Sequence, residues 1–585
     1  MTTLPPSGHV DTFARDHLPP AEQWPTLEFT TGALQFPARL NAAAELIDVP
    51  VATFGADRPA LRTPGGEVWT YGELQRRANQ VAQVLVEDLG LLPGNRVLLR
   101  SPNNPWTVAA WLGVLKAGGV VVTTFAALRV RELTPIAEKC RPAIALVDHR
   151  FVDDVEALRQ EGGPRLRILT FGSDAADDLL ARTAAKSGVF DNVETAADDV
   201  ALFCPTSGST GVPKVTTHFH RDILAIDNTF GRAVLRLVPE DVVACTAPFA
   251  FTFGLGMLVV FPLRAGACAF LTEQATPDQL ADLVAEHGVT VLATAPTAYR
   301  RILSVGKAGQ LRGLRAAVSA GEHITEQTWQ RLHDEIGLDV IDGIGATELL
   351  HIFISAAGED IRPGATGKPV PGYRAAILDE DGTELPPGAE GRLAVIGPVG
   401  CRYLDDERQL DYVVGGWNVT GDTFTRDEDG YFYYRARTDN MIISSGYNIA
   451  APEVEAAIDT HPDVAECAVV GRPDAERGSV VCAFVVLKEG VVGDTATATR
   501  IQEHVKAQLA PYKYPRDVRF TDALPRNRSG KLQHYELRRL VRAEAEAAQA
   551  AVKTAGESAG TAGAAPAGAD GSGPDTQSPH LPVRA

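Results

Sequence analysis

Cysteine is scarce in this sequence. Only seven cysteines occur among 585 residues, an odd number, and no two of them form a C-x-x-C pair. A disulfide framework or a structural zinc site needs cysteines in closely spaced sets, so this distribution excludes both as organising features. We interpret the seven thiols as small, reduced core residues.

Long apolar runs are also missing. The two most apolar stretches, "VAAWLGVLKAGGVVV" and "MLVVFPLRAGACAFL", are interrupted by Lys116 and Arg264, and neither approaches the ~20 apolar residues that cross a bilayer. The N-terminus, "MTTLPPSGHVDTFARDHLPP", contains no apolar h-region and therefore does not predict a signal peptide. We expect a cytoplasmic protein without a membrane partner.

Positive charge is in deficit. Lysine and arginine number 55 against 74 aspartates and glutamates, which gives a formal net charge of −19. A protein that coats nucleic acid needs a basic surface, so we expect no nucleic-acid partner. Any phosphate-bearing ligand has to be held by a few local cations and by backbone N–H groups.

The chain is long enough for more than one domain. Up to residue 438, short apolar runs such as "RVLLR" and "VTVLATAP" alternate with helical patterns such as "YGELQRRANQVAQVLVEDLG" (71–90). This alternation predicts an α/β fold, a large N-terminal body (1–438) of layered α/β subdomains with mostly parallel sheet. Denser strand signals over 373–397 indicate an additional β-rich subdomain.

A second unit follows the body. Residues 439–543 alternate helix and strand patterns over a short length, which predicts a small, mobile α+β C-terminal domain that acts as a lid. Residues 544–585 contain almost no large apolar side chains. Such a segment cannot bury enough surface to offset its ordering entropy, so we expect a disordered tail.

The stretch "PTSGSTGVPK", Pro205 to Lys214, follows a strand-like run and combines small hydroxyl residues, two glycines and one lysine. Glycines let the backbone approach a ligand closely, and hydroxyl, N–H and ammonium groups then converge on phosphate oxygens. It is not a P-loop, because Lys214 follows Pro213 instead of glycine. By itself the stretch is equally compatible with a plain polar surface loop.

Four further motifs follow in order. "DGIGATELLHIF" places Thr347 and Glu348 after a strand-like run, where a carboxylate suits Mg²⁺. "NVTGDTF" offers Asp422 after a tight turn, a position suited to a ribose diol. "YYRARTDN" supplies Arg437 and Asp439 at the domain junction, and "LPRNRSGKLQHYEL" ends the second domain with Lys531. Each alone is compatible with a solvated turn or a surface ion pair, whereas the ordered set indicates a nucleotide site.

In this order and wording the motifs resemble the adenylate-forming superfamily of acyl-CoA synthetases, peptide-synthetase adenylation domains and luciferases. The resemblance covers residues 25 to 543. "FAFTFGLG", "GIGATELLHIFIS" and "GATGKPVPGY" resemble more specifically the aryl-CoA ligases that act on benzoate and 2-aminobenzoate. The resemblance implies an ATP-dependent, Mg²⁺-dependent enzyme that joins an aromatic acid to AMP and then to the thiol of coenzyme A.

The resemblance also implies roles for individual residues. Lys531 bridges the acid and the phosphate, Thr347 contacts the α-phosphate, and Glu348 is both catalytic and the Mg²⁺ ligand. Asp439 is the hinge of the lid. The remaining residues that the resemblance places at the cofactors are, for the β- and γ-phosphates, Thr206, Ser207, Gly208, Ser209, Thr210, Gly211 and Lys214; for adenine, Gly321 and Glu322; for ribose, Asp422 and Arg437; and for pantetheine, Ser445, Gly446 and Tyr447.

An acyl pocket is implied by the same resemblance. Its walls are Thr252, Phe253, Ile344, Gly345 and His351, since an aromatic ring prefers flat apolar walls with a few oriented polar groups. The Thr252 hydroxyl or the His351 ring is suited to accept a hydrogen bond from an ortho-amino group. Plain packing of these side chains is the alternative.

Two other functions remain compatible with the sequence. The first is an adenylating enzyme that loads an aryl acid onto a separate carrier-protein thiol, since no carrier domain follows residue 544. The second is a non-catalytic nucleotide-binding relative, although Lys531, Glu348, Asp422 and Arg437 are all present. We expect a monomer or a homodimer.

Overall fold

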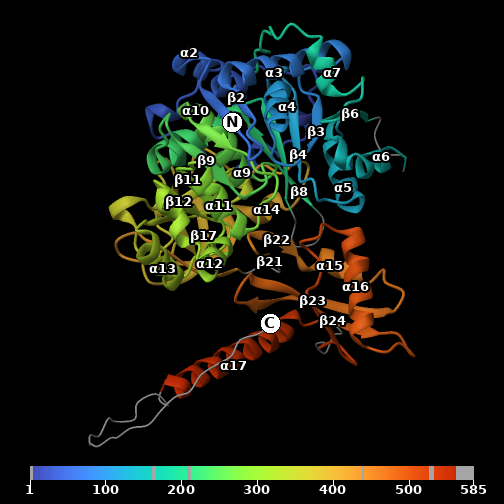
Figure 1. The fold of residues 1–585 in the computed structure, drawn as a ribbon, viewed down its shortest axis with the longest axis vertical. Helices are drawn as coiled ribbons and strands as arrows, with labels where there is room; N and C mark the ends of the chain where they lie inside the picture. The colour runs from blue at the N-terminus through green and yellow to red at the C-terminus, as the bar shows by residue number, and fades with distance from the viewer. Residues whose placement is uncertain (1–3, 161–165, 207–212, 438–440, 526–531, 561–585) are drawn as a thin grey trace, which may run out of the picture.

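The computed structural model describes residues 4–160, 166–206, 213–437, 441–525 and 532–560. Figure 1 shows a large upper part, here called the body (4–437), and a smaller lower part, here called the lid (441–543). Helix α17 (His534–Gly560) projects from the lid away from the body. The predicted α/β body with a small α+β C-terminal domain is confirmed.

The largest sheet of the body has nine strands and a parallel centre. Strands β1, β10, β9, β11, β12 and β13 are parallel neighbours in that order, while β2 at one edge and β14 and β15 at the other are antiparallel. In chain order the strands are β1 (Pro59–Arg62), β2 (Val68–Thr70), β9 (Val242–Cys245), β10 (Cys268–Phe270), β11 (Val291–Thr294), β12 (Ala316–Ser319), β13 (Val340–Gly345), β14 (Ile352–Ser355) and β15 (Lys368–Pro369).

A second, six-stranded sheet runs in the order β6-β5-β3-β4-β7-β8. Its first five strands are parallel, and β8 pairs antiparallel with β7. The strands are β3 (Arg96–Arg100), β4 (Val120–Thr124), β5 (Ile144–Asp148), β6 (Arg167–Phe171), β7 (Val200–Thr206) and β8 (Lys214–Phe219). Every residue of β3, β4 and β5 is buried, as expected for parallel strands covered on both faces.

Helices connect and cover these strands. The predicted helix over 71–90 is observed as α3 (Tyr71–Gln83), whose first turn is capped by the Thr70 hydroxyl accepting from the Glu73 N–H. One continuous core contains Leu99 of β3, Trp111 of α4 and Val291 of β11, so both large sheets contribute to it. The main helices of the body are α4 (Pro105–Lys116), α5 (Val130–Cys140), α6 (Asp153–Gln160), α7 (Leu179–Ala184), α8 (His220–Ile226), α9 (Thr252–Leu255), α10 (Phe261–Ala265), α11 (Pro277–Glu286), α12 (Pro296–Ser304) and α13 (Glu326–Ile336).

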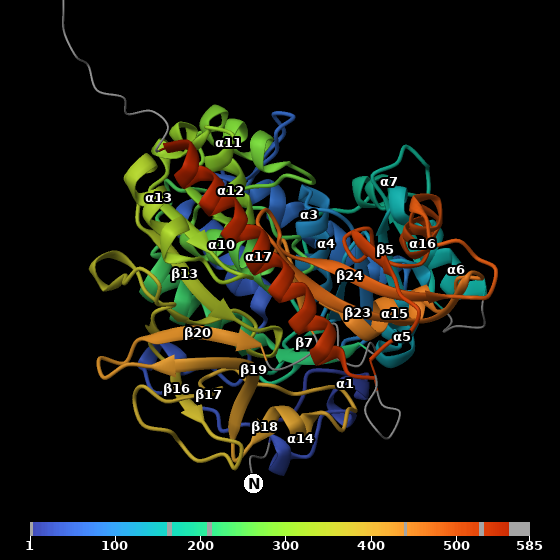
Figure 2. The same cartoon turned by 90° about the horizontal axis from the view of Figure 1, so that it is seen from below.

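The expected β-rich subdomain is a five-stranded antiparallel sheet, seen from below in Figure 2. It consists of β16 (Arg374–Leu378), β17 (Glu390–Ile396), β18 (Val413–Val414), β19 (Trp417–Arg426) and β20 (Phe432–Arg437).

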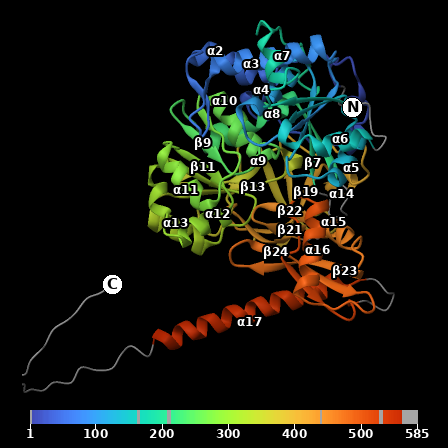
Figure 3. The ribbon, with the colours of Figure 1, turned by 45° about the vertical axis from the view of Figure 1, so that its right-hand side comes forward.

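The lid contains a two-stranded hairpin and a three-stranded sheet covered by helices. The hairpin pairs β21 (Met441–Ser444) with β22 (Tyr447–Ala450), and Figure 3 shows it on the side of the lid that faces the body. The other elements are α15 (Ala451–Ile458), β23 (Val464–Asp474), β24 (Gly478–Leu487), α16 (Thr495–Gln508), β25 (Asp517–Phe520) and α17.

Helix α17 corrects one expectation. It continues to Gly560, so residues 544–560 are helical instead of disordered, while residues 561–585 lie outside the described part of the chain. The reason is that alanine and glutamate dominate "AEAEAAQAAV"; both are strong helix formers even where no core is available. No helix within the described ranges is long and apolar enough to span a membrane.

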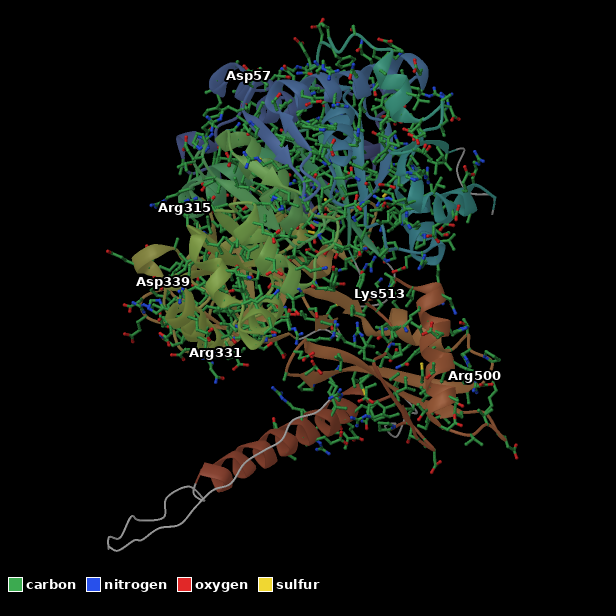
Figure 4. All side chains as sticks on the ribbon, viewed as in Figure 1. Asp57, Arg315, Arg331, Asp339, Arg500 and Lys513 are labelled. Atoms are coloured by element: carbon green, nitrogen blue, oxygen red, sulfur yellow. The ribbon has the colours of Figure 1, made fainter. Side chains whose placement is uncertain are left out.

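The lid docks on the body through a buried charge cluster. The Lys513 ammonium of the lid lies 2.6 Å from Glu132 Oε1 of α5 and 2.8 Å from Glu453 Oε1 of α15, and Figure 4 labels Lys513 at the junction of the two parts. The Lys513 and Glu132 side chains are only 5% and 4% exposed. Glu132 Oε2 also accepts the Ala510 N–H at 2.9 Å. Because these charges are buried away from water, they need each other as partners, and the contact therefore favours this pose of the lid.

We predict that Glu132→Gln loosens the lid. An amide has a single acceptor oxygen, so either Lys513 loses its acceptor or the Ala510 and Arg129 N–H groups, which both donate to Oε2, lose theirs. The Lys513–Glu453 pair inside the lid remains. Hydrogen bonds to charged groups contribute about 1.5–3 kcal/mol, so the docked population should fall by tenfold or more. Small-angle X-ray scattering should report a larger radius of gyration. Glu138→Gln, an exposed position on the same helix, is the control, and equal radii for both variants would contradict the prediction.

Candidate functional site

A cavity of about 980 Å³ lies between the body and the lid. The ends of β7, β11, β12 and β13 open into it from the body, and the β21–β22 turn of the lid closes the opposite side. Ten residues predicted from the sequence line this one space: Thr206, Thr252, Phe253, Gly321, Gly345, Thr347, His351, Ser445, Gly446 and Tyr447. The fold thus brings together motifs that are far apart in the chain.

The predicted phosphate loop connects two paired strands. Thr206 is the last residue of β7 and lies opposite Lys214, the first residue of β8. Residues 207–212, which include the predicted Ser207, Gly208, Ser209, Thr210 and Gly211, lie outside the described residues. The Lys214 ammonium lies 3.2 Å from the Tyr403 hydroxyl.

Thr347 and Glu348 form a short turn directly after β13. The turn is a 3-10 helix, Thr347–Leu349, and the His218 Nε2–H donates to the Thr347 carbonyl at 2.8 Å. The Glu348 carboxylate accepts the Tyr403 hydroxyl at 2.5 Å. A lone, oriented carboxylate fits a cation such as Mg²⁺, which is commonly held by one or two carboxylates together with substrate phosphates.

The two residues predicted for ribose share one strand pair. Asp422 in β19 lies opposite Arg437 in β20, so the register alone places their backbones side by side. Asp422 is only 7% exposed. The Arg437 side chain, like Asp439 and Lys531, lies outside the described residues.

Glu322 contacts the lid. Its carboxylate accepts the Gly446 N–H at 2.6 Å and the Thr297 hydroxyl at 3.2 Å, and Arg300 lies 3.5 Å away. Burial raises the pKa of Glu322, and these donors act against that effect. The sequence offered no signal for this contact, because its partners are 124 positions apart. A contact of Glu322 with adenine remains a prediction.

Tyr447 belongs to an aromatic cluster on the lid side of the cavity. Its ring stacks on Tyr512 at 4.4 Å and lies 6.2 Å from Phe125 and 6.0 Å from Phe251. Only Tyr447 was predicted, since the other three belong to separate segments without a common motif. Flat rings at this position suit an extended, partly apolar ligand.

His351 is buried among phenylalanine rings at the other end of the cavity. Its ring centroid lies 5.7, 5.2 and 4.7 Å from those of Phe253, Phe230 and Phe261. A Cβ on Gly256 would lie 2.4 Å from the imidazole, so this glycine is needed for the ring to fit. Sequence reasoning did not single out Phe230, Phe261 or Gly256. Gly256 ends the stretch "FAFTFGLG" that carried the resemblance, whereas Phe230 and Phe261 belong to no quoted motif.

The imidazole of His351 stays neutral at physiological pH. Burial lowers its pKa to about 3, while the Phe253 backbone acts in the opposite direction. Neither ring nitrogen has a hydrogen-bond partner of normal geometry among the described residues. Both ring nitrogens are buried at the cavity wall, where a neutral imidazole can accept or donate one hydrogen bond once a ligand reaches it.

Some predicted residues do not line this cavity. Ile344 is partly buried and packs against the main core. Lys214, Glu322, Glu348 and Asp422 also lie outside the lining. Glu322 contacts the lining residue Gly446, and Lys214 and Glu348 directly follow the lining residues Pro213 and Thr347.

The sequence matches two models of known protein families. The model of the AMP-binding enzyme family matches residues 48–402, and that of the AMP-binding enzyme C-terminal domain matches residues 453–531. The chain belongs to the AMP-binding enzyme family. Its fold and motifs are those of an adenylate-forming enzyme, as the sequence predicted.

Several similar proteins are ligases that join an acid to coenzyme A. Benzoate–CoA ligase of Thauera aromatica is 34% identical over 516 residues, which cover 87% of this chain and 98% of that protein. The structure of the anthranilate CoA ligase AuaEII in complex with anthranoyl-AMP superposes with a TM-score of 0.68 at 30% identity, covering 88% of this chain and 100% of that one. The amide bond synthetase McbA from Marinactinospora thermotolerans superposes with a TM-score of 0.77 at 25% identity, covering 86% and 99%. This AMP-binding enzyme is therefore an AMP-forming acid–CoA ligase with ATP and coenzyme A as substrates.

We predict that the body loses stability in acid through its buried histidines. His351 and His220 are fully buried with pKa values lowered by burial to about 3, below the ordinary 6.5. Below pH 6.5 the unfolded chain binds protons that the folded chain does not, so stability falls as the pH falls. Each histidine then costs about 2 kcal/mol at pH 5.

Thermal unfolding between pH 7 and pH 5 tests this prediction. His351→Gln should show a smaller decrease of Tm over this range than the unchanged chain, because glutamine does not titrate. His333→Gln, which alters an exposed histidine, is the control. Parallel Tm curves for all three proteins would contradict the prediction.

Proposed function

We propose that this AMP-binding enzyme is an aryl acid:CoA ligase whose acid is 2-aminobenzoate or benzoate. The observation that carries the proposal is the neutral His351 imidazole, which belongs to the cavity wall and packs among phenylalanine rings. An aromatic acid matches these flat walls, and an ortho-amino group can donate to the imidazole. The names of two relatives, benzoate–CoA ligase and anthranilate CoA ligase, support the same class of acid, anthranilate being 2-aminobenzoate.

The first step joins the acid to AMP. A carboxylate oxygen of the acid attacks the α-phosphorus of ATP, the bond to the leaving pyrophosphate breaks, and acyl-AMP forms. Two anions meet in this step, so cations must neutralise the developing charge. We assign Lys531 and Lys214 to that role, Thr347 to the α-phosphate, Glu348 to Mg²⁺, and Asp422 with Arg437 to the ribose.

The second step transfers the acyl group to a thiol. The sulfur attacks the acyl carbonyl, the bond to AMP breaks, and a thioester forms with the release of AMP. In the observed pose Ser445, Gly446 and Tyr447 line the cavity, which matches the predicted pantetheine tunnel. We propose that Asp439 is the hinge on which the lid turns between the two steps.

Free coenzyme A is the thiol that the charges favour. Arg477 lines the cavity, and its guanidinium contacts the Ser445 hydroxyl at 3.2 Å. Burial lowers the pKa of Arg516, and the nearby Arg477 charge lowers it further. The Asp474 carboxylate lies close enough to raise the pKa of Arg516 and accepts the Arg477 backbone N–H at 2.8 Å, but among the described residues it forms no ion pair with either guanidinium. The phosphate groups of coenzyme A match this local positive charge.

A substrate panel tests the proposed acid. With benzoate, 2-aminobenzoate, hydroxybenzoates, phenylacetate and hexanoate, we expect kcat/KM for thioester formation to be highest for 2-aminobenzoate or benzoate. His351→Leu should reduce the preference for 2-aminobenzoate over benzoate about fivefold to tenfold, because one neutral hydrogen bond contributes about 1 kcal/mol. His287→Leu, which lies outside the cavity lining, is the control. A higher rate with hexanoate would contradict the proposal.

The same panel separates the alternative functions. Pyrophosphate release without aryl-CoA would favour loading of a separate carrier protein. No pyrophosphate release with any acid would favour a non-catalytic relative.

We also predict that Lys531→Ala separates the two steps. Loss of one oxyanion-stabilising group typically reduces a rate about 10²–10³-fold, so acid-dependent exchange of pyrophosphate into ATP should fall by that factor. Thioester formation from preformed acyl-AMP should be comparatively unaffected, because no charge then has to be neutralised on the leaving pyrophosphate. Equal losses in both half-reactions would contradict the role of Lys531. Lys506→Ala, a surface lysine of the lid, is the control.

A further inference from the structure

Tyr403 lies between the cation and the anion of the proposed ATP site. Its hydroxyl is 2.5 Å from Glu348 Oε1 and 3.2 Å from the Lys214 ammonium. A carboxylate oxygen can only accept, so the hydroxyl proton points to Glu348 and an oxygen lone pair faces Lys214. One phenol group therefore satisfies both charged side chains at once.

The position of Tyr403 is rigid. The side chain is fully buried, the backbone bridges Thr216 of β8, and the Tyr403 N–H donates to Gln409 Oε1 at 2.9 Å. The Lys214 ammonium also lies 4.8 Å above the Tyr403 ring, which stabilises a cation there. The ring thus holds Lys214 beside the start of β8 independently of the hydroxyl.

Lys214 and Glu348 do not contact each other. Within the described residues no ion pair joins them, although both bind the same hydroxyl oxygen. Oppositely charged side chains so close together pair directly when nothing separates them. A direct pair would occupy the ammonium and the carboxylate, and it would have to break before a triphosphate or a divalent cation could bind.

We propose that Tyr403 is a positioning residue that keeps Lys214 and Glu348 apart, so that the ammonium remains available to the triphosphate of ATP and the carboxylate to Mg²⁺. The inference rests on the proposed function for the roles of Lys214 and Glu348. Tyr403 itself does not touch the reacting atoms. Its part is to hold two charges in place with a neutral group between them.

Tyr403→Phe removes the hydroxyl and retains the ring. The ring still attracts the Lys214 ammonium, but no hydroxyl then separates it from Glu348, so the two charges can pair directly. We expect calorimetry without Mg²⁺ to report a Kd for ATP about tenfold higher, the effect of one charge-assisted contact. The Mg²⁺ concentration that gives half-maximal ATP binding should also rise. Binding of 2-aminobenzoate alone should not change.

A double-mutant cycle separates this mechanism from a structural effect. Glu348→Gln leaves Lys214 without an anionic partner, so on this background Tyr403→Phe should not weaken Mg²⁺-free ATP binding further.

Tyr71→Phe is the control for the loss of a buried hydroxyl, because it removes another fully buried tyrosine hydroxyl, one bonded to the carbonyls of Pro262 and Ala267. It should lower Tm without changing the Kd for ATP.

A rescue variant keeps the test decisive if Tyr403→Phe is poorly folded. Tyr403→Gln again offers a donor to Glu348 and an acceptor to Lys214, so its Kd for ATP should be close to that of the unchanged chain, a comparison that does not need Tyr403→Phe. The proposal is overturned if Tyr403→Phe binds ATP as tightly as the unchanged chain. It is also overturned if the loss is equally large in the Glu348→Gln background.

These readouts are independent of the acid. If ATP binding follows the expected pattern but no aromatic acid is adenylated, the proposed substrate class fails and the role of Tyr403 stands. If aryl-CoA forms but the cycle shows no coupling, the role of Tyr403 fails and the proposed function stands.

Discussion

The buried contact of Lys513 with Glu132 and Glu453 is the constraint on which the cavity depends. It joins the lid to α5 of the body, and in this pose the β21–β22 turn closes the space over the strand ends of the body. Removing charges from water is costly unless each charge is paired, so the cluster selects one orientation of the lid more than it adds stability. The Glu322–Gly446 hydrogen bond then aligns the turn itself.

A few positively charged side chains close to the proposed ligands offset the net negative charge of this enzyme. The chain has a net charge of −19, yet its proposed substrates are ATP, a carboxylic acid and coenzyme A, all anions at neutral pH. Lys214 at the start of β8 provides positive charge next to the lining residue Pro213, and Arg477 of the lid provides it in the cavity lining itself. Because such groups act over a few ångströms in a water-poor space, a small number suffices despite the overall negative charge.

The sequence predicted much of the fold and some of the residues that line the cavity. The α/β alternation, the β-rich subdomain and the lid follow from hydrophobic patterns that reflect local burial. Thr347 and Tyr447 line the cavity and belong to motifs contiguous in the chain. Ile344 packs against the core instead, and motif membership alone does not tell which residues of a strand reach a cavity. The helix over 544–560 was not predicted, because the prediction of disorder rested on the lack of large apolar side chains and did not consider helix propensity.

The sequence by itself determined which chemical groups are present and in which order: a hydroxyl-rich loop before Lys214, Thr347 and Glu348 after a strand, and a lysine near the end of the lid. Only the tertiary structure decided their neighbours. Tyr403 lies between Lys214 and Glu348, and phenylalanine rings surround His351, because strands far apart in the chain pair side by side. Contacts of that kind leave no periodic or contiguous trace in a single sequence, and they set the local dielectric and hydrogen bonding on which protonation and ligand choice depend.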